Sequence, residues 1–262
     1  MIGSLKTSLF LVLSAALSMS LVAGETLEVP ATSPDIHLGH SLRVVSDEEA
    51  TFYYGSGFPS VSFGQLPDAA DVDAFHGLAN GDVLFSLESS VSLDGVLYRP
   101  FDVIRFDGVI WSKEFDGAAE GIPNGVNVDA VAMSGGSLLL SVDITTTLDG
   151  ATYDDSDVIA HDGAVFSLFL GTDTAGISSA ADLDALHVDE TGRVLVSFEG
   201  SGQLGGVDFN DEDLLAFDSA VWSMEFDGSA DDSAWQAVDL DAWSTVFVDD
   251  NMFKDGYESE EF

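Results

Sequence analysis

The sequence predicts an all-β protein, a β-propeller of four blades of four antiparallel strands that is closed by pairing of its N- and C-terminal segments. Three observations predict this fold. A short acidic phrase recurs at a nearly constant spacing, each copy carries four short apolar segments, and the two chain ends supply complementary parts of one further copy. Four antiparallel strands per repeat of this length are typical of propeller blades.

The recurring phrase consists of an acidic or amide residue, an apolar residue, a second acidic residue and Ala. Its second acidic residues lie 56, 55 and 57 positions apart along the chain. A fixed period in this range is the mark of a repeat architecture. The four copies occupy residues 71–74, 127–130, 182–185 and 239–242.

Within the first copy, four runs rich in β-branched and aromatic residues are separated by turn signals. The runs cover residues 72–75, 83–87, 103–106 and 109–115, with Asn80-Gly81 and Asp107-Gly108 between the pairs. Such runs joined by Asn-Gly or Asp-Gly indicate strands connected by tight hairpins. In the three full copies the aromatic residue of the fourth run lies nine positions after the Asp before the third run: Asp102 and Trp111, Asp157 and Phe166, Asp213 and Trp222.

The two ends of the chain predict a fourth blade. Residues 47–54 align with residues 211–218 and so resemble the later strands of a blade, whereas the C-terminal copy has the opening phrase followed by a single strand, residues 239–247. Joining the two ends would complete the ring and remove exposed sheet edges. The propeller is expected over residues 41–248. An open array of blades and a β-sandwich remain alternatives.

The flanking segments predict export. Residues 1–24 resemble a signal peptide, with Lys6, an apolar run over 8–22 and small residues at 22–24. A membrane anchor is the alternative, but a run of this length is short of the roughly 20 residues that span a bilayer. Residues 25–40 are expected to be a lead-in arm and residues 249–262 an acidic C-terminal tail. The mature protein would then be secreted or periplasmic, without a membrane span.

The composition is extremely acidic: 47 Asp and Glu face 7 Lys and Arg, a formal net charge of −40. Nucleic acid is excluded as a partner because phosphate binding needs clustered Lys and Arg. Charge of this size repels itself unless bound cations or a salty medium compensate it. The composition therefore fits a halophilic or marine secreted protein, or a calcium-dependent one. The chain has no Cys, which excludes disulfides and thiolate metal sites.

The repeated segments resemble a known but uncharacterised sequence repeat. Copies built on V-D-A-L, L-L-S, D-E-D-L and D-G turns look like a repeat found in secreted proteins of Gram-negative bacteria, carried here by 72–74, 139–141 and 211–214. The tail over 252–258 is similar to an I-F-x-D-G-F-E ending of such exported proteins, with Met252 and Tyr257 departing from it. The resemblance implies a propeller-like fold and export, and brings no activity with it.

The repeated phrase is also the strongest candidate site. In a closed ring its acidic positions would converge at one level, and seven carboxylates with one amide cannot all stay ionised there without compensation. Calcium, which takes 6–8 oxygen ligands, is the candidate cofactor. Asp side chains that only cap local turns are the alternative. The candidate metal ligands are Asp71, Asp73, Asn127, Asp129, Asp182, Asp184, Asp239 and Asp241.

Other candidates are weaker. A second acidic set precedes the third strands, at Glu49, Asp102, Asp157 and Asp213, but its flanks vary from copy to copy. His76 and His187 occupy one repeat position in two copies, and either metal binding or packing would explain them. A carbohydrate-stacking face, if present, is expected at Trp235, Trp243, Tyr53 and Tyr54. No Ser-His-Asp arrangement emerges, so no catalytic residue is assigned.

These observations favour an exported acidic β-propeller that acts as a non-catalytic binding or scaffold module for an extracellular or periplasmic ligand. One alternative is an extracellular polymer-degrading hydrolase or lyase that uses carboxylates on one face of the ring. The other is a structural component of the cell surface or a biofilm. The even recurrence of the acids speaks against an enzyme, because an active site usually breaks the repeat in one copy.

Overall fold

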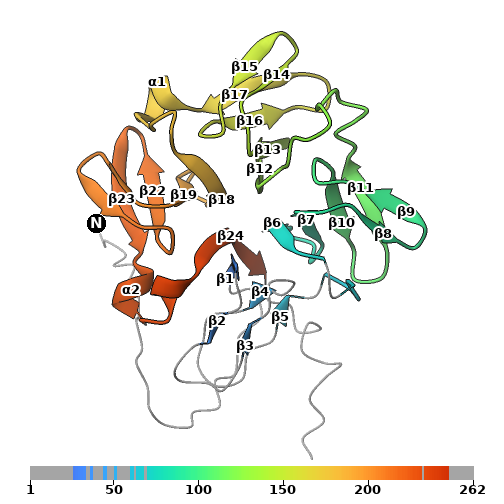
Figure 1. Cartoon of the computed structure of the whole chain (residues 1–262), viewed down its shortest axis with the longest axis horizontal. Helices are drawn as coiled ribbons and strands as arrows, with labels where there is room; N and C mark the ends of the chain where they lie inside the picture. The colour runs from blue at the N-terminus through green and yellow to red at the C-terminus, as the bar shows by residue number, and fades with distance from the viewer. Residues whose placement is uncertain are drawn as a thin grey trace, which may run out of the picture.

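The protein is almost entirely β-structure, arranged as sheets around a common centre (Figure 1). The computed structural model describes residues 63–67, 70–231 and 233–247, and short strands between residues 26 and 61; side chains are described for 63–67, 70–171, 174–231 and 233–244. The predicted signal peptide and acidic tail lie outside the described residues, as do Glu49, Tyr53 and Tyr54.

Three antiparallel sheets of four strands each contain most of the strand residues that the structure describes, which confirms the predicted all-β, blade-like units. Sheet 1 contains β6 (Val72–Gly77), β7 (Val83–Leu87), β10 (Val103–Phe106) and β11 (Trp111–Phe115). Sheet 2 contains β12 (Ala130–Ser134), β13 (Ser137–Ser141), β16 (Val158–His161) and β17 (Phe166–Leu170). Sheet 3 contains β18 (Asp182–Val188), β19 (Val194–Glu199), β22 (Leu214–Asp218) and β23 (Val221–Phe226).

Each sheet also carries a small hairpin between its second and third strands. The turns of the first two hairpins are Asp-Gly pairs, and Asp94 and Asp149 adopt φ values of 49° and 52°, as a tight hairpin turn requires. Alternating apolar residues flank these turns. The hairpins are β8 (Val91–Leu93) with β9 (Val96–Tyr98), β14 (Thr146–Leu148) with β15 (Ala151–Tyr153), and β20 (Gly202–Leu204) with β21 (Val207–Phe209).

An N-terminal strand pairs with the C-terminal one, but it lies before residues 47–54, the segment in which the repeat placed the N-terminal part of the fourth blade. β24 (Asp239–Phe247) pairs antiparallel with β1 (Thr26–Ser33), which falls in the segment expected to be a lead-in arm. Two further pairs follow β1: β2 (Ile36–His37) with β3 (Val44–Val45), and β4 (Ala50–Thr51) with β5 (Ser60–Val61). β1 also contacts β4. A fourth blade with four strands in one ladder stays a prediction.

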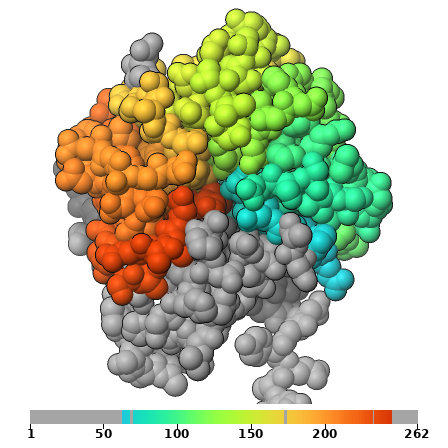
Figure 2. All heavy atoms as spheres, in the orientation of Figure 1, coloured from blue at the N-terminus to red at the C-terminus, as the bar shows by residue number. Residues whose placement is uncertain are grey.

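The first strands of the units contact one another in cyclic order. β6 contacts β12, β12 contacts β18, β18 contacts β24, and β24 contacts β6. Figure 2 shows the red surface of β24 beside the cyan surface of β6 near the centre. These four strands therefore surround the axis of the molecule, and the phrase that opens each of them is brought to one place.

The hydrophobic cores lie between consecutive sheets. One cluster joins Phe101 and Phe115 of sheet 1 to Leu140 and Ile159 of sheet 2, and the next joins sheets 2 and 3. A third cluster packs sheet 3 against Leu240 and Trp243 of β24, and a fourth includes Ala242 of β24 with sheet 1. Each sheet thus buries both faces against its neighbours, and this burial is the main term that stabilises the arrangement.

In sheets 1 and 3 a buried Asp before the third strand holds two loop segments together. Asp213 is 3% exposed; its Oδ2 accepts the Asn210 N–H at 2.9 Å and its Oδ1 accepts the Gly228 N–H at 3.1 Å. Asp102 repeats the arrangement with the N–H groups of Arg99 and Gly117. A Cβ at Gly117 would lie 2.2 Å from the Phe101 carbonyl oxygen, so this position needs Gly.

Short helices α1 (Thr172–Ala175), α2 (Gly228–Asp231) and the 3₁₀ turn η1 (Trp235–Ala237) lie in the connections between sheets. Trp222 of the fourth strand in sheet 3 donates its Nε1–H to the Ala175 carbonyl at 2.8 Å, and Trp111 in sheet 1 donates likewise to Phe63 at 2.7 Å. The recurring aromatics therefore anchor the connections. Among the described residues, no helix has the length and apolar character needed to cross a membrane.

The buried Asp of sheet 3 predicts a large and specific loss of stability. Replacing Asp213 by Ala leaves the buried N–H of Gly228 and the partly buried N–H of Asn210 without their acceptor, so the free energy of unfolding should fall by about 2–4 kcal/mol. The exposed Asp218 in the same sheet is the matched control, and D218A should change it by less than about 0.5 kcal/mol. Urea unfolding of both variants checks this. Equal losses in the two would show that the Asp213 hydrogen bonds do not stabilise the fold.

Candidate functional site

The opening phrase joins each sheet to the one before it. Its apolar residue is fully buried, and the N–H of that residue bonds to a carbonyl in the preceding sheet's loop: Val128 to Pro100 at 3.1 Å, Leu183 to Asp155 at 3.3 Å, and Leu240 to Asp211 at 3.2 Å. The Ala of the phrase is also buried in each copy. A small residue suits a position where neighbouring first strands approach closely. These bonds fix the two acidic positions around the axis.

The second acidic residues of the four phrases, Asp73, Asp129, Asp184 and Asp241, meet at this axis and are called the axial acids. Burial is the main cause that raises the pKa of each of them, to about 7 for Asp73 and about 9 for Asp184 and Asp241. Burial also raises the pKa of Asp129 well above its usual range. Mutual repulsion adds to the effect, since Asp73 and Asp184 each destabilise the ionised forms of Asp129 and Asp241.

The residues at the first position of each phrase lie two residues before the axial acids, and their interactions differ from copy to copy. The Asn127 Nδ2 donates a short hydrogen bond to Asp73 Oδ2. Burial and nearby carboxylates raise the pKa of Asp182 to about 7 and of Asp239 to about 6. Asp71 contributes charge that raises the pKa of Asp241. Each of the eight predicted side chains thus interacts, through a hydrogen bond or through its charge, with at least one other of the set. Whether they hold a metal stays a prediction.

Several oxygens in this region are buried without a hydrogen-bond donor. Asp129 is only 7% exposed, and its Oδ1 has no partner. Asp155, which precedes the third strand of sheet 2, was not among the predicted ligands, although its place before Asp157 repeats the acidic loop of Asp211. Its charge raises the pKa of Asp182. The donor-free buried oxygens are Asn127 Oδ1, Asp129 Oδ1, Asp155 Oδ1, Asp182 Oδ1 and Asp184 Oδ2.

A histidine pair fills the axis next to the acids. The rings of His76 and His187 lie 5.7 Å apart, and both are buried. Burial lowers the pKa of His76 to about 3 and of His187 to about 4, so both are neutral at pH 7. In β24 the equivalent Ser244 accepts the Gly77 N–H at 2.9 Å. His76 and His187 therefore pack against each other as two buried, neutral side chains.

The remaining candidates have structural roles. Asp102 and Asp213 hold loop segments of sheets 1 and 3 together, and Asp157 accepts the Asp154 N–H at 3.0 Å. Trp235 and Trp243 are 1% and 3% exposed and pack on Phe226, so the expectation of a carbohydrate-stacking face on these two was wrong. Their hydrophobic area covers the junction of sheet 3 and β24 instead. Within the described part of the chain, no group of three or more His, Asp or Glu side chains has the arrangement of a formed metal site.

Comparison with known proteins gives weak similarities. No family model and no curated protein matches the sequence. The extracellular domain of a putative one-component system from B. thetaiotaomicron matches with a TM-score of 0.33 at 8% identity, over 77% of this chain and 23% of that chain. A protein of unknown function from Bacteroides caccae matches with a TM-score of 0.31 at 9% identity, over 77% of this chain and 57% of that one.

YCF48 from Cyanidioschyzon merolae gives a TM-score of 0.31 at 8% identity, over 70% of this chain and 52% of that chain. The chain spans less than two thirds of each of these three proteins. Identities and TM-scores this low assign no ligand or activity to this chain.

The axial acids predict an unusual pH dependence of stability. A carboxyl with a folded pKa above its unfolded value of about 4 binds protons more tightly in the folded chain, so stability is highest at low pH and falls as pH rises toward the folded pKa. In EDTA at fixed high salt, the free energy of unfolding should therefore decrease above pH 5, by about 1.4 kcal/mol per pH unit for each such group. The decrease ends near the folded pKa, about 7 for Asp73 and about 9 for Asp184 and Asp241.

The variant D184N/D241N should flatten this decrease, because both carboxyls have a folded pKa of about 9. D94N/D149N is the matched control: it removes the same formal charge from two exposed hairpin turns, where Asn tolerates the left-handed φ. Urea unfolding at pH 5, 7 and 9 measures the slope. A slope that the control flattens as much as D184N/D241N does would contradict the assignment to the axial acids.

Proposed function

We propose that the protein is an exported, non-catalytic binding or scaffold module whose ring is stabilised by a divalent cation, with calcium as its cofactor. One observation carries the proposal: carboxylates from four sheet-forming segments repel one another near the axis, and several oxygens there receive no donor. Asp129 is buried, and the other three axial acids are half-buried. Buried polar groups normally have hydrogen-bond partners, and an unsatisfied one costs about 1–3 kcal/mol. A bound cation would satisfy several of these oxygens at once.

The chemistry of the residues fits calcium. Carboxylate and amide oxygens are the ligands it prefers, and it accepts irregular geometry with 6–8 of them. Asp129 and Asp184 supply donor-free carboxylate oxygens, and Asn127 supplies a donor-free amide oxygen. Because the described acids do not already form a metal-binding group, binding would include rotation of these side chains toward the ion. The ion would also lower the pKa of each ligand that it contacts.

Among the described residues, the strand serines of sheets 2 and 3 do not form a nucleophile–base pair, and this favours a binding role. The strand serines of sheets 2 and 3 are used structurally: Ser141 Oγ donates to the Asp155 carbonyl at 3.1 Å, and Ser197 Oγ donates to the Leu240 carbonyl at 2.7 Å. Neither has a histidine partner among the described contacts. The phrases contribute equivalent acids, which suits a shared structural ion better than a single reaction centre.

A hydrolase or lyase acting on extracellular polymers is the second candidate, favoured by the pKa values of about 7 for Asp73 and Asp182. A carboxyl that titrates near neutrality suits general acid–base catalysis. Purified protein assayed against a panel of polysaccharides decides between the candidates. The binding module predicts no turnover, whereas turnover that D73N/D182N abolishes would establish the enzyme.

Calcium should raise the melting temperature at constant ionic strength. At a calcium concentration about 100 times the dissociation constant, linkage adds about 2.7 kcal/mol, which corresponds to a rise of about 5–10 °C over protein in EDTA. D73N/D184N should lose most of this rise. The exposed pair D94N/D149N should keep it, because its residues lie in hairpin turns away from the axis.

Differential scanning calorimetry of the three proteins at one high sodium chloride concentration measures the effect. Holding the salt fixed separates specific binding from charge screening. An unchanged melting temperature in calcium and EDTA would remove the cation from the proposal.

A further inference from the structure

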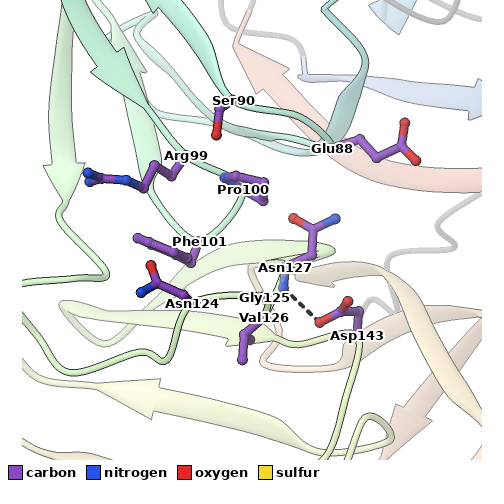
Figure 3. Close-up of a pocket in the computed structure, with 10 residues that line it drawn as sticks. All are labelled: Glu88, Ser90, Arg99, Pro100, Phe101, Asn124, Gly125, Val126, Asn127 and Asp143. Carbon is purple, nitrogen blue, oxygen red and sulfur yellow. Dashed lines mark hydrogen bonds between the residues drawn. The ribbon is translucent and has the colours of Figure 1, made fainter.

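A groove lies between sheets 1 and 2, at the edge of the core cluster that joins them (Figure 3). Its lining includes Asn127, whose side chain bonds to the axial acid Asp73. Its volume is about 530 Å³, which falls in the range of sites for small ligands. Four loop segments line it, so both sheets must be in place to form it. The lining residues are Glu88, Ser90, Arg99, Pro100, Phe101, Asn124, Gly125, Val126, Asn127 and Asp143.

Arg99 is the unusual member of this lining. The other Lys and Arg side chains that the structure describes each pair with a carboxylate: Arg105 with Asp82 at 2.5 Å, Lys113 with Asp102 at 2.8 Å, and Arg193 with Glu225 at 2.8 Å. No such pair is formed by Arg99 with the side chains described. In a chain of net charge −40, an arginine that pairs with none of the surrounding acids has donors available for a ligand.

The position of Arg99 is nevertheless fixed. Its guanidinium lies 5.8 Å from the centre of the Phe101 ring, a cation–π contact. Its backbone N–H donates to the buried Asp102 at 2.9 Å. The side chain is half-buried, and Asn124 lies at the same end of the groove (Figure 3). A planar guanidinium held in this way is suited to bidentate recognition of a carboxylate.

The other end of the groove carries the opposite charge. Glu88 and Asp143 lie there, on the far side of Pro100 from Arg99 (Figure 3). Asp143 is held by the Asn127 N–H, which donates to its Oδ1 at 2.7 Å. Both carboxylates raise the pKa of Asp73, which places them within electrostatic reach of the axial acids. This end therefore attracts a cationic group, and the groove is dipolar along its length.

We propose that this groove binds a short zwitterionic peptide, with its terminal carboxylate at Arg99 and Asn124 and its ammonium group at Glu88 and Asp143. A polyanion would meet the negative end and the net charge of the whole molecule, and a polycation would leave Arg99 without a counter-charge. A ligand with both charges satisfies both ends. The inference rests on the proposed binding function and names its ligand class.

The test uses the full chain and trialanine as the probe, with its two capped forms as matched ligands. Isothermal titration in constant calcium and salt should show binding of trialanine. Amidation of its C-terminus or acetylation of its N-terminus should each weaken binding about ten-fold or more, because each removes a charge-assisted contact. R99Q should weaken trialanine binding to a similar extent and leave the affinity for trialanine amide unchanged. E88Q should likewise weaken trialanine binding and leave the affinity for N-acetylated trialanine unchanged.

R105Q is the control, because Arg105 belongs to the same sheet but does not line the groove. It should bind trialanine as the unmodified protein does, and melting curves confirm that each variant is folded. Trialanine that binds no more tightly than both capped forms, or R99Q that binds like the unmodified protein, would overturn the inference. A calcium-dependent melting shift without trialanine binding would overturn the peptide-binding inference alone. Trialanine binding without a calcium-dependent shift would overturn only the proposed role of the cation.

Discussion

Burial of carboxylates at the axis is the constraint on which the rest of the structure depends. Packing of the first strands around a common centre brings Asp73, Asp129, Asp184 and Asp241 into mutual repulsion and at least partly out of water. An ionised group in such surroundings is costly unless it is protonated, paired or bound to a cation. Charge repulsion in this acidic chain therefore acts locally, among the axial acids, as well as across the whole molecule.

The same four-residue phrase both builds the ring and creates this problem. Its apolar residue and its Ala are buried between neighbouring sheets. The N–H groups of Val128, Leu183 and Leu240 donate to loop carbonyls of the preceding sheet. Its acidic residues are carried to the axis by that packing. A ligand at the axis would therefore act on the junctions between sheets, so that cation binding and ring stability are one equilibrium in the proposed function.

The sequence allowed the strands to be predicted because periodicity and turn chemistry are local: the Asp-Gly turns and the runs around Trp111 and Trp222 mark each hairpin. It did not show that residues 26–33 pair with β24, since Pro30 interrupts any strand pattern there. The axial acids were predictable because they repeat. Asp155 and Arg99 were not, since their importance comes from what lies across a sheet boundary, and the burial of Trp235 likewise depends on packing between sheets.

Crystals grown in calcium, with anomalous-difference density measured at a wavelength where calcium scatters, test the central claim most directly. The account predicts a peak at the axis with carboxylate oxygens of the axial acids, Asp129 and Asp184 among them, at about 2.3–2.6 Å. Crystals that show no peak there while the carboxylates keep their mutual separation would contradict it, because protons alone would then compensate the buried charge.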